Sequence, residues 1–419
     1  MYNVLSRLKP KVNESIRYLI VKRSAHNELP ALNTEYLCNP KNITAISENI
    51  TRRKGVGNIE TVHKLHEQLQ NNEDEQVKQQ FYNELLKIPN DTHPAVMDYG
   101  MEPKILKYVG EKRKFSFKPK EFHDITKKLN IMRTNQLGNV AGNRSYYFLG
   151  ALAELEQALI KYTVNKLLQL GYQLLSVPDI LPSNIIESCG MNTKGERTQV
   201  YTLDHEPDLC LSGTSEMAIA GYLKNKVLSI DKLPVKLAAV SRCYRAETSS
   251  VAEERGIYRV HQFTKVEMFA VTTPEESDEV LESFRDFQER HFSSLDIHLQ
   301  TLDMPPHELG APAYRKYDLE AWLAGRKMYG EVSSCSNCTD YQSRRLNIKY
   351  AMDNGELRHV HTVNGTACAI PRLLIALLET HQNEDGTVQI PDALKPFVRF
   401  EEINREKRIP ELKLKKIKR

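Results

Sequence analysis

The segment 241–269, SRCYRAETSSVAEERGIYRVHQFTKVEMF, constrains the fold of this chain more than any other stretch. It is typical of a strand that delivers Arg245 and Glu247, followed by a charged loop and a returning strand. Residues 258–263 alternate as they would on the two faces of a strand. We therefore expect a β-hairpin here. Arginine beside glutamate on a hairpin is commonly a structural ion pair, so this segment alone does not decide function.

The remaining patterns predict helices and further strands around this hairpin. The run from Leu149 to Leu170 is expected to form a long amphipathic helix that ends at Gly171. The run from Pro371 to Leu378 is expected to start a final long helix, with proline near its first turn. Strand-like runs occupy 174–177, 236–240 and 266–271. Because helices come first and strands then follow with few helices between them, we predict an α+β body with an antiparallel sheet.

Residues 41–88 have narrow apolar seams, which suit helices that pack on each other. We expect turns at Gly55 and Gly57, and at Asn71 and Asn72. The two seams consist of Val62, Leu65 and Leu69, and of Val77, Phe81, Leu85 and Ile88. The pattern predicts a short helical hairpin that projects from the body.

The first 24 residues are basic, with Glu14 as their single acid. Their apolar residues recur mostly at spacings of three and four. A basic, acid-poor amphipathic helix is typical of an organellar transit peptide, so we expect mitochondrial targeting. A surface helix of the mature fold is the alternative.

Several classes of protein and site are excluded by simple patterns. No stretch of about 18 apolar residues occurs, which excludes an integral membrane protein with spanning helices. Neither GxGxxG nor GxxxxGK[ST] occurs, so a nucleotide would have to bind without a Rossmann or P-loop site. The net charge of +4 permits a nucleic-acid partner without requiring one.

The seven cysteines are scattered over the chain, which indicates free thiols in a reducing compartment. Cys335 and Cys338 form the only closely spaced pair. A zinc site would need two more ligands at suitable spacing, and no second pair exists. We therefore expect ordinary thiols here, with a metal or redox role as the alternative.

Three segments, taken in order, resemble the motifs of class II aminoacyl-tRNA synthetases. The segment 241–269 resembles motif 2, and its amino-acid sequence is most similar to that of seryl-tRNA synthetases. The segment 171–178, GYQLLSVP, resembles motif 1, and 362–372, TVNGTACAIPR, resembles motif 3. The wording of 364–368 and the short motif 2 loop resemble the mitochondrial branch of the family. The resemblance implies a class II antiparallel sheet flanked by helices, and a ligase that activates L-serine with ATP and transfers it to mitochondrial tRNA(Ser).

The resemblance also implies which residues bind ATP. The serine carboxylate and the triphosphate repel each other, so cations must bridge them. Arg245 and Arg372 are the implied catalytic residues: Arg245 clamps the α-phosphate, and Arg372 covers adenine opposite Phe263. Glu247 and the backbone of Val260 are assigned to the base. The implied ATP-binding set is Arg245, Ala246, Glu247, Val260, Phe263, Glu331, Val332, Ser333, Ser334 and Arg372.

A second set of residues is implied to select serine. Glu216 and Glu267 are assigned to the ammonium and hydroxyl groups, with Thr366 near the hydroxyl. A pocket built to hydrogen-bond a hydroxyl rejects alanine, whereas threonine must be refused by size. Lys265 and Arg259 are left open, as structural or tRNA-facing residues. The implied serine-binding set is Thr214, Ser215, Glu216, Glu267, Asn364 and Thr366.

Cofactor, partners and location follow from the same resemblance. Glu331 and Ser334 match the family's ligands of Mg²⁺, a hard ion that prefers oxygen. Motif 1 implies a dimer, either of two copies or with a related chain. The basic run 104–120 is a candidate for tRNA phosphate contacts, with a solvated loop as the alternative. We expect the mitochondrial matrix as the location and no membrane association.

The length of 419 residues predicts two or three domains at roughly 150 residues each. We expect a targeting segment at 1–24, a tRNA-binding helical arm at 25–103, a catalytic domain at 104–400 and a basic tail at 401–419. The arm is shorter than the long coiled coil that the family usually carries.

Two other functions remain open at this point. A non-catalytic synthetase-like protein would bind RNA or a partner subunit, but such proteins usually lose ATP or serine ligands, which this chain retains. Another class II synthetase, for threonine or proline, is disfavoured by the serine-type wording around Thr214 and Glu267.

Overall fold

The computed structural model describes residues 30–72, 74–134, 142–195, 198–248 and 256–410. The expected targeting segment at 1–24 lies outside the described residues. So do the end of the basic tail and part of the motif 2 loop.

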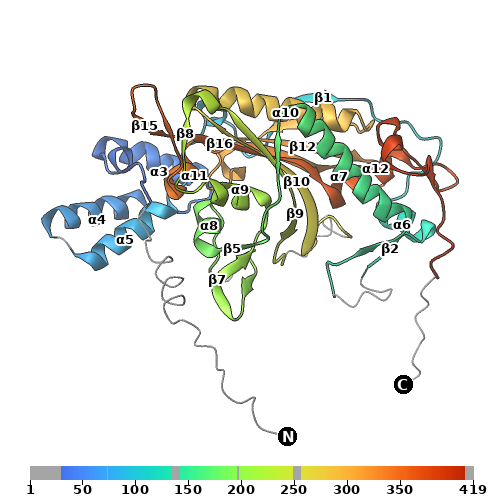
Figure 1. The fold of residues 1–419 in the computed structure, drawn as a ribbon, viewed down its shortest axis with the longest axis horizontal. Coiled ribbons are helices and arrows are strands. Elements are labelled where there is room, and N and C mark those ends of the chain that lie inside the picture. Colours follow the sequence, from blue (N-terminus) through green and yellow to red (C-terminus); the bar gives the residue numbers. More distant parts are fainter. Residues whose placement is uncertain (1–29, 73, 135–141, 196–197, 249–255, 411–419) are drawn as a thin grey trace, which may run out of the picture.

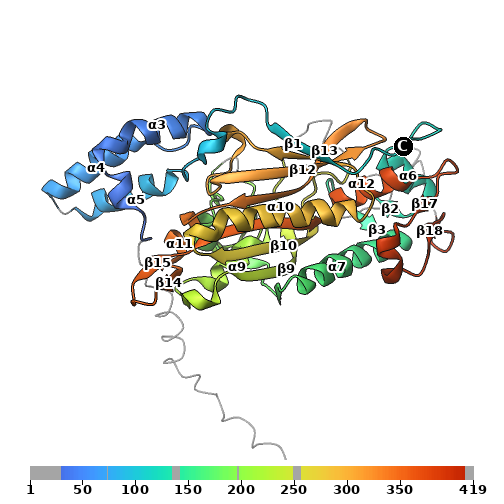
Figure 2. The ribbon, with the colours of Figure 1, turned by 90° about the horizontal axis from the view of Figure 1, so that it is seen from above.

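The body is built on an eight-stranded sheet in the order β1-β11-β12-β13-β16-β10-β9-β4 (Figures 1 and 2). Neighbouring strands run antiparallel, except that the edge strand β4 runs parallel to β9. The predicted α+β fold with an antiparallel sheet is therefore confirmed. The strands are β1 (Lys104–Val109), β4 (Gln173–Leu175), β9 (Val235–Tyr244), β10 (Gln262–Thr272), β11 (Leu299–Asp303), β12 (Arg315–Leu323), β13 (Met328–Asn337) and β16 (His361–Ala369).

Helices flank this sheet, and small sheets of two or three short strands border it (Figures 1 and 2). The helices of the body are α6 (Phe122–Leu129), α7 (Ala151–Gln169), α8 (Ser183–Ser188), α9 (Ser215–Leu223), α10 (Ser277–Ser293), α11 (Tyr341–Leu346) and α12 (Ile370–His381). The smaller strands are β2 (Met132–Arg133), β3 (Tyr147–Phe148), β5 (Ile180–Pro182), β6 (Thr202–Leu203), β7 (Glu206–Leu211), β8 (Val227–Ser229), β14 (Lys349–Ala351), β15 (Leu357–His359), β17 (Val388–Gln389) and β18 (Glu402–Ile403). None of the described helices is long and apolar enough to cross a bilayer.

Alternation along β10 assigns its side chains to two different faces of the sheet. Val266 and Met268 belong to the large core formed with α7, α10 and α12, which lie over one face (Figure 2). Phe269 belongs to a second core, formed with α8, α9 and α11 on the other face. Lys265 and Glu267 therefore point away from the large core, toward the face on which α9 packs.

The two long helices predicted from sequence are confirmed. Helix α7 ends at Gln169, and Gly171 follows with φ of +82°. A positive φ raises the conformational free energy of glycine less than that of other residues. Glycine therefore commonly ends a helix in this way. Helix α12 carries Pro371 in its first turn, where a missing N–H does no harm.

The N-terminal arm consists of three main helices and has a core of its own. They are α3 (Ile43–Arg52), α4 (Ile59–Asn71) and α5 (Glu75–Lys87), preceded by the short α2 (Thr34–Leu37). The predicted hairpin is confirmed as the α4–α5 pair, with α3 as an additional helix beside it (Figure 2). Val62 and Leu85, from the two predicted seams, are fully buried in the arm core. The arm projects from one end of the body (Figure 1).

Two expectations about strands and loops are wrong. The returning strand of the 241–269 hairpin begins at Gln262, because residues 256–259 form turns and bends. There the Tyr258 ring packs against Arg372, and its carbonyl accepts from Arg372 Nε at 3.3 Å. The solvated-loop alternative for 104–120 is wrong for its first part, which forms the edge strand β1 and pairs with β11.

Candidate active site

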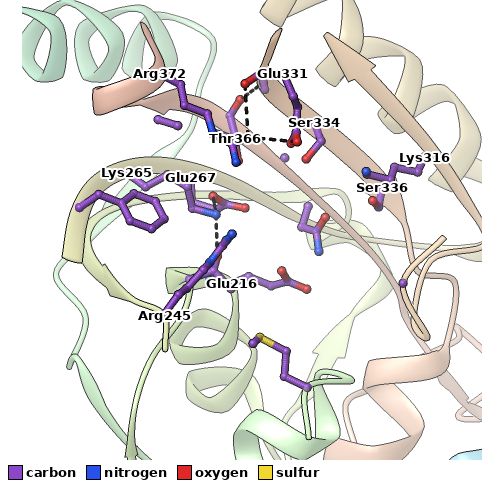
Figure 3. Close-up of a pocket in the computed structure, with 18 of the residues that line it drawn as sticks. Glu216, Arg245, Lys265, Glu267, Lys316, Glu331, Ser334, Ser336, Thr366 and Arg372 are labelled. Carbon is purple, nitrogen blue, oxygen red and sulfur yellow. Dashed lines mark hydrogen bonds and ion pairs between the residues drawn. The ribbon is translucent and has the colours of Figure 1, made fainter. Parts of the chain in front are cut away.

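A cavity of about 380 Å³ lies on the sheet face that carries Lys265 and Glu267 (Figure 3). It collects most of the residues that the family resemblance assigned to ATP and serine. These are Thr214, Glu216, Arg245, Glu247, Val260, Phe263, Glu267, Glu331, Val332, Ser333, Ser334, Asn364, Thr366 and Arg372. Ala246 and Ser215 do not line it. Ser215 is buried in α9, and the N–H of Ala246 donates to the Gln199 carbonyl at 2.8 Å.

One end of the cavity is built where β10 meets the start of α9. Thr214 caps α9, and its hydroxyl accepts from the Glu216 N–H at 3.3 Å. Lys265 Nζ lies 2.5 Å from Glu267 Oε2 and donates to Thr214 Oγ1 at 2.8 Å. Arg245, which follows β9, points toward this group (Figure 3). Two acids and two cations therefore share one end of the cavity.

The protonation of these acids is set mainly by their burial. Burial raises the pKa of Glu267 to about 7, although the ammonium of Lys265 opposes this shift. Burial also raises the pKa of Glu216, against Lys265 and the amide of Gln342. That amide donates to Glu216 Oε1 at 2.5 Å. A cationic ligand in this end of the cavity would favour the ionised form of both acids.

The opposite end of the cavity is held by an arginine–glutamate pair. Arg372 Nη1 lies 3.0 Å from Glu331 Oε2, and its guanidinium lies 4.6 Å from the Tyr258 ring centre. Burial alone would raise the pKa of Glu331, but Arg372 and then Lys316 outweigh it and lower the pKa to about 2. Glu331 is therefore ionised at any physiological pH.

The strand pair β12–β13 supplies further oxygen atoms beside Glu331. Ser333 Oγ donates to the Thr366 carbonyl at 2.5 Å, so this hydroxyl is already engaged within the protein. Ser334 lies directly opposite Asp318 in the strand register. Asp318 Oδ1 is buried without a hydrogen-bond partner among the described residues, while Oδ2 lies 2.8 Å from Lys316 Nζ.

The middle of the cavity is formed by the motif 2 and motif 3 strands. The guanidinium of Arg245 lies 5.3 Å from the Phe263 ring centre, within reach of a cation–π contact. Glu247 lies 3.6 Å from Arg259, in an ion pair that holds the segments on either side of the motif 2 loop together. Thr366 of β16 pairs directly with Glu267 of β10. The sheet register thus brings two of the implied serine-binding residues side by side.

Comparisons with known proteins show the family to which the chain belongs. Residues 201–381 match the family model of the tRNA synthetase class II core domain (G, H, P, S and T). The chain is 41% identical over 336 residues to the serine–tRNA ligase of Rubrobacter xylanophilus, covering 79% of each chain. The chain belongs to the serine–tRNA ligase family. It is also 46% identical over 340 residues to the mitochondrial serine–tRNA ligase of Bos taurus, covering 80% of this chain and 66% of that relative.

Solved structures of the serine–tRNA ligase family share the fold. The seryl-tRNA synthetase of Pyrococcus horikoshii complexed with ATP superposes with a TM-score of 0.76 and 32% identity, over 94% of this chain and 88% of that one. The cytoplasmic serine–tRNA ligase of Naegleria fowleri in complex with AMP gives 0.72 and 30% identity, over 84% and 77%.

Some residues of this ligase-family cavity were not singled out from the sequence. Lys316 lines it from β12, and Tyr258 supports Arg372. Lys316 and Asp318 alternate with apolar residues, a strand signal that does not reveal their proximity to Glu331. Met191 and Gly310 come from loops without a motif. Only the tertiary fold brings these segments together.

The cysteine pair of the ligase-family chain lies in and after β13. Cys335 and Cys338 are both free and buried, and burial raises the pKa of each thiol well above its usual value. Within the described ranges, no group of three or more histidine, cysteine or acidic side chains is arranged to hold a metal ion. Cys338 lines the cavity, where its sulfur accepts from Asn364 Nδ2 at 3.9 Å.

Proposed function

We propose that this protein activates L-serine with ATP to seryl-adenylate and transfers the seryl group to mitochondrial tRNA(Ser). The observation that carries this proposal is a single cavity in which Arg245 lies beside Glu216 and Glu267 at one end, with Arg372 at the other end. A zwitterionic amino acid and a triphosphate need carboxylates for the ammonium group and cations for the carboxylate and the phosphates. No observation favours the catalytically inactive alternative.

Serine is held at the end where the two buried acids lie. Its ammonium group binds to carboxylate oxygens of Glu216 and Glu267, and its hydroxyl lies near Thr366. Lys265 keeps Glu267 in place and offsets its charge when the site is empty. Alanine leaves the polar atoms of this pocket without a partner and so binds weakly.

ATP lies toward Arg372, with its α-phosphate near Arg245. When the serine carboxylate oxygen attacks the α-phosphorus, the bond to the leaving pyrophosphate breaks and negative charge grows on the α-phosphate oxygens. Arg245 stabilises that charge in a site that is already oriented. Arg372 and Phe263 hold the adenine ring between them, and Glu247 accepts a hydrogen bond from its amino group.

Magnesium fits the residues next to Arg372. Glu331 is ionised, Ser334 offers a hydroxyl, and the buried Asp318 Oδ1 opposite it has no hydrogen-bond partner among the described residues. Two protein oxygens together with phosphates and waters are a usual environment for this ion. When bound, Mg²⁺ neutralises charge on the triphosphate, and Glu331 and Ser334 hold it.

We propose a dimer through the edge of the sheet that ends in β4. Three exposed leucines cluster at the end of α7 and on β4: Leu168, Leu170 and Leu174, each 46–47% exposed. Burying such an apolar edge favours association, either with a second copy or with a related chain. We further assign residues 25–103 to tRNA contact, 104–400 to catalysis, 401–419 to a basic tail, and the protein to the mitochondrial matrix.

The direct test is charging of tRNA with labelled serine by the purified chain. We expect seryl transfer to mitochondrial tRNA(Ser) and none to a mitochondrial tRNA for another amino acid. Charging of neither tRNA by folded protein that binds ATP would contradict the proposal.

A further inference from the structure

A buried arginine at the base of the arm binds the loop that forms one wall of the cavity. Arg53 directly follows α3 and is 5% exposed. Its guanidinium donates to the carbonyls of Gly310 at 2.5 Å, Ala313 at 2.9 Å and Asn90 at 2.9 Å. Among the described residues, no carboxylate lies within ion-pair distance of it. Main-chain carbonyls therefore satisfy this buried cation, and its position is fixed by the loop.

Asn90, in the segment that follows α5, donates to the carbonyls of Ala311 and Pro312, and Arg53 Nη2 also donates to the Ala311 carbonyl at 3.4 Å. The main-chain N–H of Asn90 donates to Ala311 O at 2.9 Å, and its Nδ2 donates to Pro312 O at 2.8 Å. The same Nδ2 lies 2.9 Å from the Cys338 carbonyl. Every carbonyl from 310 to 313 thus accepts a hydrogen bond from Arg53 or Asn90. The arm and the segment that joins it to the body hold this loop along its whole length.

The loop 310–313 is part of the cavity wall near the implied serine-binding residues. Pro312 packs so closely on Gly190 that a Cβ there would lie 2.6 Å from Pro312 Cδ. Gly190 and Cys338 also line the cavity. Cys338 in turn contacts Asn364. A shift of the loop would therefore displace Asn364 and the residues around it, whereas Arg372 lies at the other end of the cavity.

We propose that Arg53 is a positioning residue for the serine end of the cavity, through which the arm sets the wall formed by 310–313. This inference rests on the proposed function. Removing the guanidinium takes away the donor to the Ala313 carbonyl and leaves the Gly310 carbonyl with the Ala313 N–H alone, so we expect the loop to shift until water can replace the lost donor. Lysine restores the charge but offers a compact ammonium in place of the planar fork, so it serves the separate carbonyls only in part.

The test compares Arg53→Met, Arg53→Lys and Asn90→Ala with the parent chain in serine-dependent ATP–pyrophosphate exchange. Arg52→Met is the matched control, because Arg52 is the preceding residue and its side chain is 43% exposed. We expect the KM for serine to rise about tenfold in Arg53→Met and less in Arg53→Lys, with the KM for ATP changed by less than about twofold. The control keeps both parental values.

Two results would overturn the inference. One is a serine KM within about twofold of the parent in folded Arg53 variants, even if their melting temperature falls. The other is an equal rise in the KM values of serine and ATP, which would indicate a general loss of structure. If Arg53→Met fails to fold, the KM values for serine and ATP are compared in Arg53→Lys and Asn90→Ala instead. Absence of exchange in the parent chain would instead refute the proposed function, so the two failures are distinct.

Discussion

Lys265 Nζ lies 2.5 Å from Glu267 Oε2, and both side chains are almost completely buried. The two residues are neighbours on one face of β10, so the strand itself holds them together. Lys265 also reaches Thr214 at the start of α9. Lys265, for which the sequence alone predicts no single role, therefore joins the sheet to the helix that carries Glu216.

Lys265→Met is expected to destabilise the protein. Breaking a buried ion pair from one side costs about 3–5 kcal/mol, because the remaining charge loses its partner. We expect the free energy of unfolding, measured with denaturant at pH 8, to fall by about this amount. The double variant Lys265→Met/Glu267→Gln removes both charges and should recover more than half of the loss. If the double variant is no more stable than Lys265→Met, the loss of stability does not come from breaking the ion pair.

The affinity for serine is expected to depend on pH near neutrality. Since burial raises the pKa of Glu267 to about 7, its carboxylate becomes protonated as the pH falls through 7 and stops attracting the substrate ammonium. We expect the KM for serine to rise by up to about tenfold per pH unit below 7. The KM for ATP should stay flat over the same range, since Glu331 has a pKa of about 2. A serine KM that is constant from pH 8 to pH 6 would contradict this assignment.

Arg372→Met is expected to slow pyrophosphate exchange by about 100-fold and to raise the KM for ATP, because it removes a preorganised cation from the site. Serine binding, measured by calorimetry without ATP, should not change. Arg358→Met is a suitable control, since Arg358 forms an exposed ion pair with Glu356 on the surface. Exchange at the parental rate in Arg372→Met would remove this residue from the mechanism.

Gly365→Ala tests the packing beneath the site. A Cβ on Gly365 in β16 would lie 2.9 Å from Cys335 Cβ and 3.0 Å from Phe284 Cδ2. We expect the free energy of unfolding to fall by about 1–3 kcal/mol from this overpacking. Gly100→Ala should change it by less than about 0.5 kcal/mol, because no atom lies within 4 Å of the added carbon. Equal effects at both positions would contradict the close packing of β16.

Leu174→Glu is expected to dissociate the proposed dimer, because it adds a charge to the exposed edge strand β4. Sedimentation velocity should then report a monomer. Ile105→Glu is the matched control: Ile105 is 46% exposed on β1, the opposite edge of the same sheet. A Leu174→Glu protein that keeps the mass of the parent would place the interface elsewhere.

Sequence patterns within a single helix predicted where that helix ends and which of its faces is buried. The helix ending before Gly171 and the apolar seams of α4 and α5 depend on residue spacing along one element, and the structure contains them. The returning strand was predicted to begin too early because Tyr258 alternates like a strand residue but packs against Arg372. A contact between segments more than 100 residues apart has no local signal.

The site shows the same limit. Most residues that the motifs predicted to bind substrates line one cavity, but no motif marks the loop at 310–313 or its hydrogen bonds to Arg53. Their role depends on a fold that brings residue 53 next to residue 310. Lys316 likewise looks like an ordinary charged strand residue until β12 and β13 are paired.

Amino-acid-dependent ATP–pyrophosphate exchange by the purified chain measures whether this cavity activates serine. We predict exchange with serine, and rates with alanine and threonine that are lower by at least about 100-fold. Folded protein that binds ATP but shows no serine-dependent exchange, or that exchanges equally with alanine, would contradict serine activation in this cavity.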